Sequence, residues 1–110
     1  MSKVFFTKIS EQTNWVMGEH EGGYSFQALL FDLGSEYGIN EGRVSKLMIK
    51  KTDTEGWDPQ YAVVNYDREW DVRPKNPEVR KVYKEILVFL ESAPDKMQLR
   101  KEQGGGYQRT

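Results

Sequence analysis

The sequence predicts an α+β fold: an antiparallel sheet of about four to five strands packed against one C-terminal helix, followed by a flexible C-terminal tail. Three observations support this class. Short segments of alternating apolar and polar residues occupy the chain as far as residue 72. Clusters of Gly, Asp and Pro separate these segments, as turns do. A single helical pattern comes last, and strands followed by a helix are typical of α+β folds.

The strands are expected in hairpin order. Gly22 and Gly23 can take up positive φ and therefore predict a tight turn between the second strand and the third. Asp53, Gly56 and Pro59 mark a longer turn before the last strand. The expected strands span residues 3–9, 15–18, 24–33, 43–51 and 61–71.

The helix is expected from Pro77 to about Ser92. Asn76 is a favourable N-cap, Pro77 suits the first helical position, and Pro94 ends the pattern. Apolar residues at three- and four-residue steps predict the stripe that covers the sheet. These residues are Val79, Val82, Tyr83, Ile86 and Leu90.

Composition limits the classes of function. The 110 residues suit a single α+β domain over residues 1–94, and the glycine-rich end predicts a flexible basic tail over residues 95–110. A net charge of −1 argues against a general nucleic-acid or membrane-surface binder. The absence of cysteine excludes disulfides and thiolate nucleophiles. We expect a cytoplasmic protein that needs no cofactor and has no membrane partner.

Acidic residues concentrate in the last expected strand. If residues 61–71 form one strand, alternation places Asp67, Glu69 and Asp71 on one face. Three carboxylates can bind a hard cation such as Mg²⁺, so a metal-dependent enzyme is one hypothesis. The sole histidine, His20, is not among them, and a solvated strand end is the favoured interpretation. His20 itself, between Glu19 and Glu21, is interpreted as a surface turn residue rather than a catalytic one.

The opposite face of the same expected strand carries Tyr66, Arg68 and Trp70. These residue types dominate interface hot spots, which makes the three a candidate partner-binding surface. The same types also anchor a helix on a sheet, and this core role is the favoured interpretation.

Basic residues give a second candidate surface. A nucleic-acid-associated module is the alternative to protein binding, and it would contact phosphates through lysine and arginine. A solvated face is the simpler interpretation of such charges. The residues concerned are Lys46, Lys50, Lys96, Arg100 and Lys101.

Two short motifs resemble those of a small family found in phages and their Gram-positive hosts. The first has the form GIxxGRxSKL, the second NYDRxWD, and Trp15 precedes both, so that the resemblance covers about residues 15–74. It implies a mobile-element accessory protein and brings no catalytic residue. The matching positions are Gly38, Ile39, Gly42, Arg43, Ser45, Lys46 and Leu47, then Asn65, Tyr66, Asp67, Arg68, Trp70 and Asp71.

The motifs also suit a scaffold. Gly38 and Gly42 permit a tight loop, and Arg43 could form an ion pair with Asp67 or Asp71 across adjacent strands. The leading hypothesis is therefore a non-enzymatic accessory protein that binds a host protein, a defence nuclease being one example. The surplus apolar residues Leu87 and Phe89 add the expectation of a homodimer.

Overall fold

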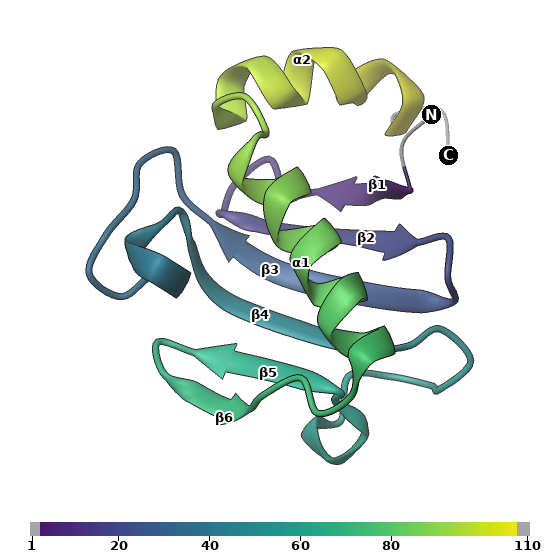
Figure 1. Ribbon diagram of the computed structural model, residues 1–110. Coiled ribbons are helices and arrows are strands. Elements are labelled where there is room, and N and C mark those ends of the chain that lie inside the picture. Colours follow the sequence, from purple (N-terminus) through teal and green to yellow (C-terminus); the bar gives the residue numbers. More distant parts are fainter. Residues whose placement is uncertain (1–2, 108–110) are drawn as a thin grey trace.

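The computed structural model describes residues 3–107 and shows a six-stranded antiparallel sheet with two C-terminal helices (Figure 1). The α+β class is confirmed, with six strands instead of four to five and two helices instead of one. Every strand pairs with its neighbour in sequence, so the sheet order is β1-β2-β3-β4-β5-β6. The strands are β1 Val4–Ile9, β2 Trp15–His20, β3 Tyr24–Leu30, β4 Val44–Lys51, β5 Val64–Asp67 and β6 Trp70–Val72. The helices are α1 Pro77–Glu91 and α2 Lys96–Tyr107, with 3₁₀ turns η1 Ile39–Glu41 and η2 Pro59–Tyr61.

The sixth strand exists because the expected strand over residues 61–71 is broken. β5 ends at Asp67, and Arg68 takes a φ of 64° that no strand allows. The chain reverses there, with the Asp67 N–H donating to the Glu69 carbonyl at 2.9 Å. Two short strands therefore replace one, and the alternation on which two of the predicted surfaces rested does not hold.

α1 crosses one face of the sheet and forms the core with it (Figure 1). Its start is as predicted: the Asn76 side chain accepts from the Val79 N–H at 2.8 Å, and Pro77 is the first helical residue. The predicted stripe is confirmed for four positions, while Tyr83 is half-buried. The buried members are Val79, Val82, Ile86 and Leu90.

α2 replaces most of the expected flexible tail. It lies beside the edge strand β1 (Figure 1) and buries Leu99, while the Lys96 backbone N–H donates to the Asp32 carboxylate at 2.9 Å. Long-range contacts hold this segment, and sequence periodicity does not reveal them. Residues 108–110 of the expected tail lie outside the described residues. Within residues 3–107, no helix has the length and apolar character that crossing a membrane requires.

No helix of residues 3–107 lies on the second face of the sheet, which is called the open face here. Cross-strand pairs identify its residues: Trp15 lies opposite Leu29, and Met17 lies opposite Gln27, which in turn faces Met48. These side chains point away from α1 because their neighbours along each strand are buried beneath it.

Candidate functional site

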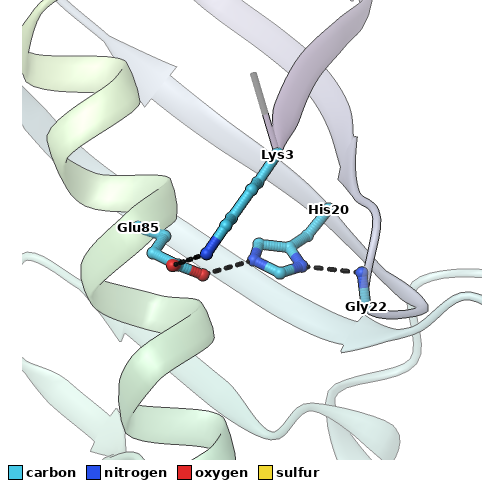
Figure 2. A network of polar contacts seen from close by, with 4 residues as sticks. All are labelled: Lys3, His20, Gly22 and Glu85. Carbon is cyan, nitrogen blue, oxygen red and sulfur yellow. Dashed lines mark hydrogen bonds and ion pairs between the residues drawn. The ribbon is translucent and has the colours of Figure 1, made fainter. Parts of the chain in front are cut away.

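A polar cluster joins the β2–β3 hairpin to α1. His20 and Tyr24 lie directly opposite each other at the hairpin end, and each contacts a glutamate of α1. His20 Nε2 lies 2.7 Å from Glu85 Oε1, and Lys3 Nζ lies 3.1 Å from Glu85 Oε2 (Figure 2). The phenol of Tyr24 donates to Glu78, two helical turns before Glu85. We call this set of five residues the hairpin clamp.

His20 is a buried residue at the end of β2, so its interpretation as a surface turn residue is wrong. Its Nδ1 accepts the Gly22 N–H at 2.8 Å (Figure 2), which places the ring proton of the neutral imidazole on Nε2, toward Glu85. Both ring nitrogens are thus used within the molecule. A general base needs a free lone pair facing a substrate, and this imidazole presents none.

The clamp shifts the ionisation of its acidic members. The hydrogen bond from His20, then that from Lys3, holds the pKa of Glu85 below its ordinary value. The hydrogen bond to Glu78, together with burial, raises the pKa of Tyr24 to about 12. A hollow of about 520 Å³ lies beside these groups. Each polar group of the clamp has an intramolecular partner, which is typical of a structural contact.

Arg43 forms a second polar contact, at the C-terminal end of α1. Its guanidinium donates to carbonyls of Glu91, Ala93 and Pro94, and its Nε donates to the Phe31 carbonyl at 2.8 Å. Helix C-termini leave carbonyls unpaired and carry partial negative charge, so a cation is favoured there. The predicted ion pair with Asp67 or Asp71 is wrong, because the motif arginine turns toward the helix.

The glycines of the first motif serve the same contact. A Cβ at Gly42 would overlap the Glu91 carboxylate, which accepts the Arg43 N–H at 2.8 Å and 3.1 Å through its two oxygens. A Cβ at Gly38 would overlap the carbonyl of Gly42. The motif GIxxGR therefore closes a loop around the end of α1.

The acidic triplet is not assembled as predicted. Asp67 ends β5 and pairs with Lys46 at 3.6 Å, Glu69 lies in the turn, and Asp71 follows in β6. Within residues 3–107, no group of three or more His, Cys, Asp or Glu is placed to hold a metal ion. The single strand that would have aligned the three carboxylates does not form.

Tyr66 and Trp70 pack inward instead of forming a surface with Arg68. Tyr66 is buried and donates to the Tyr37 carbonyl at 2.9 Å. Trp70 stands edge-on between Tyr66 and Tyr83, with ring centroids 5.1 Å and 5.5 Å away. Arg68 alone points outward, 5.9 Å from the Tyr37 ring. The motif NYDRxWD therefore fixes the β5–β6 hairpin to α1, which agrees with the favoured core role.

Most of the predicted phosphate-binding cations are committed within the molecule. Lys50 is buried, donates to the Thr54 carbonyl, and lies 4.9 Å from the Trp57 ring. Lys96 is buried and donates to the Leu30 carbonyl and to Asn14 Oδ1. Arg100 donates to the carbonyls of Ser10 and Thr13 at 3.0 Å and 3.1 Å, and Lys46 pairs with Asp67. Lys101 is exposed on α2.

The open face carries apolar side chains that the fold leaves in contact with water. Leu33 is 81% exposed and Tyr37 54%, and they line a hollow of about 590 Å³ together with Phe31 and Leu29. Trp15, paired with Leu29, extends this surface and lines two further hollows. We call Trp15, Leu29, Phe31, Leu33 and Tyr37 the apolar platform.

The platform was missed at the level of sequence, although one signal was present. Leu29 and Phe31 break the alternation of the third strand, and such a break predicts a strand end that is buried on both faces. Phe31 is instead 36% exposed. Alternation places an apolar residue on a face, but it does not tell whether another element covers that face.

Comparison with known proteins places the chain in a family. Residues 14–91 match the family described as a domain of unknown function, DUF7678, and this stretch is more than half of the chain. The chain belongs to DUF7678. No curated protein and no solved structure matches it. The DUF7678 region runs from β2 through α1 and so contains the apolar platform, Arg43 and two of its carbonyl partners, Phe31 and Glu91, while β1 and α2 lie outside it.

Proposed function

We propose that the chain is a non-enzymatic accessory protein that binds another protein through the apolar platform on its open sheet face. The observation that carries the proposal is the exposure of Trp15, Phe31, Leu33 and Tyr37 on one face, where the last three line a common hollow. Soluble domains seldom leave such apolar patches in water unless a partner covers them. Aromatic side chains are also enriched at the centres of protein interfaces.

The polar groups beside the platform suit a protein partner. Asn14, Ser35 and Arg68 border the same hollow as Phe31 and Leu33, so an apolar centre has a polar edge. Protein interfaces combine these two zones, the centre for burial and the edge for orientation. A phosphate backbone would instead require a cluster of free cations, and Lys50, Lys96 and Arg100 are turned inward.

The class of partner is proposed from the motifs that resemble those of the phage family. An accessory protein of a mobile element acts on a host factor, and we propose a cytoplasmic host protein as the partner. A defence nuclease is one member of that class.

The test is affinity capture from host lysate treated with nuclease, with matched variants as bait. Leu33→Lys places a charge in the platform, and Trp15→Thr removes its largest ring while keeping a residue that suits a strand. Met97→Lys is the control, because Met97 is 70% exposed on α2, away from the open face. A partner that binds the wild-type chain and Met97→Lys, but neither platform variant, supports the proposal.

The captured protein is then purified and titrated against the same four chains by calorimetry. We expect saturable one-site binding for the wild-type chain and at least a tenfold weaker Kd for Leu33→Lys. Equal binding of all four chains would refute the platform as the site. Recovery of no protein that distinguishes the baits would refute protein binding through this face.

A further inference from the structure

A second apolar surface lies on the opposite side of the molecule, between the two helices. A groove of about 730 Å³ runs over β1, with α1 as one wall and α2 as the other. Its floor is apolar: Phe6 and Phe89 are in ring contact at 4.7 Å, and Val4 and Leu99 are buried beside them. The predicted dimer residues Leu87 and Phe89 are half-buried in the fold, so the exposed part of this surface belongs to other residues.

The α1 wall carries an exposed apolar side chain. Val88 lines the groove and is 66% exposed. Burial of an exposed apolar side chain stabilises a complex, and this gain opposes the costs of association. The groove therefore offers an apolar floor and one exposed apolar edge to one occupant.

The charges on the two walls are of opposite sign at matching positions. Lys84 on α1 and Glu102 on α2 both line the groove and both are exposed. Each is nine residues along the chain from Ala93, which lies in the α1–α2 connection. Because an α-helix rises about 1.5 Å per residue, the two charges lie at similar distances from the closed end of the groove.

This arrangement is self-complementary, and we propose that the groove is the seat of a second copy of this chain. A two-fold axis along the groove exchanges the walls, so α1 of one copy faces α2 of the other. Lys84 then meets Glu102 of the second copy, and Val88 is covered by α2 of the second copy. The same contacts are made twice, as an isologous interface requires.

The sheet edge beside the groove does not compete as a dimer contact. β1 is an edge strand, and its register shifts between Phe6 and Lys8, which marks a bulge at Thr7. A bulge and a lysine both oppose strand addition at a sheet edge. The helical face is consequently the surface by which two copies associate.

Charge reversal tests the proposal by sedimentation velocity of the full chain over a range of concentrations. Lys84→Glu alone sets glutamates 84 and 102 of the two copies against each other, and Glu102→Lys alone does the same with lysines. We expect each variant to dimerise at least tenfold more weakly than the wild-type chain. Lys75→Glu makes the same charge change before α1, outside the groove, and should leave the dimer unchanged.

The decisive sample is an equimolar mixture of Lys84→Glu and Glu102→Lys. Opposite charges now meet only between unlike chains, so the mixture should dimerise about as well as the wild-type chain. A contact between residues 84 and 102 within one chain cannot produce this result. Circular dichroism of each variant checks that these exposed substitutions preserve the fold.

Two results would overturn the proposal. One is a wild-type chain that stays monomeric at millimolar concentration. This result overturns the proposal even if the groove binds a fatty acid or a foreign protein in place of a second copy. The other is a mixture that dimerises no better than its components. Neither result bears on the open face, whose partner is tested with a different set of variants.

Discussion

The two faces of the sheet differ in how their side chains are satisfied. On the face under α1, polar groups at the rim have protein partners: His20 contacts Glu85, Tyr24 contacts Glu78, and Arg43 contacts the carbonyls that end the helix. On the open face, Trp15, Leu33 and other apolar groups meet water, with no layer above them in the described residues.

The difference separates structural residues from candidate functional ones. Motifs rich in charged and aromatic residues are the obvious candidate sites in the sequence, yet most of their residues hold the helix to the sheet. The exposed apolar residues belong to no charged motif. Substitutions on the two faces should therefore act on different properties, namely stability for the covered face and association for the open one.

The largest loss of stability is expected for Arg43→Ala on the covered side. The variant removes a charged donor from four carbonyls, and hydrogen bonds from charged groups contribute about 1.5–3 kcal/mol each when intact. We expect the free energy of unfolding in urea to fall by about 3 kcal/mol or more. Arg43→Lys should recover little, since an ammonium group cannot reproduce the fork.

Arg68→Ala is the matched control on the open side. Arg68 has one ring contact, to Tyr37 at 5.9 Å, and an exposed contact of this kind is worth about 0.5–1 kcal/mol. A loss for Arg68→Ala as large as that for Arg43→Ala would break the distinction between the two faces.

Neighbouring residues of β2 sharpen the comparison at a single strand. Gly18 faces α1, where a Cβ would overlap the Phe26 ring and the Phe5 carbonyl oxygen. Gly18→Ala should lower the free energy of unfolding by about 1–3 kcal/mol, the range for overpacked cores. Met17 points to the open face, and Met17→Ala should cost about 1 kcal/mol or less. The reverse order in urea titrations would mean that the faces are assigned wrongly.

Acid should weaken the hairpin clamp through Glu85. Its pKa lies below the ordinary 4.5 in the folded chain, because His20 and Lys3 donate to its carboxylate. The unfolded chain therefore binds the proton first, and this stabilisation is lost as the pH falls from about 4.5 through the folded pKa. We expect wild-type and Glu85→Gln stabilities to converge across this range.

The measurement is the free energy of unfolding at successive pH values between neutrality and the acid transition. Glu36→Gln provides the control, because Glu36 is exposed in the β3–η1 loop. Parallel pH profiles for wild-type and Glu85→Gln would show that ionisation of Glu85 contributes nothing to the free energy of unfolding.

Alkali should strengthen the attachment of α2. Burial lowers the pKa of Lys96 from 10.5 to about 8, so the folded chain releases this proton before the unfolded chain does. Stability from this group rises as the pH increases from about 8 to 10.5. We expect wild-type stability to rise over this interval relative to Lys96→Met, whereas the exposed Lys101→Met should follow the wild-type profile.

Local sequence patterns predict those elements whose positions depend on interactions within a few residues. Asn76, Pro77 and the stripe ending at Leu90 place α1 because capping and periodicity act within a few residues. The paired glycines at 22 and 23 place the hairpin, with Gly23 at a φ of 93°. The tight turn at Arg68 was missed because a non-glycine residue takes up positive φ there.

The site residues are less predictable, because their partners are distant in the sequence. His20 looks solvent-facing between two glutamates, and its partner lies 65 residues later. Arg43 bonds to main-chain carbonyls, which leave no signature in the sequence. α2 is held through Lys96 and Arg100, whose charges resemble a solvated tail until the acceptors around Asn14 and Ser10 are known.

The sequential order of the strands has a consequence for folding kinetics. Each strand pairs with its neighbour, so the sheet can assemble through short loops, whereas Arg43 and His20 reach α1 only after closures of 48 and 65 residues. These two contacts should form after the transition state. Arg43→Ala should thus speed unfolding and leave the refolding rate nearly unchanged, with a φ-value near zero. The contacts of α1 would then slow the unfolding of the native fold and have little effect on the rate at which the sheet forms.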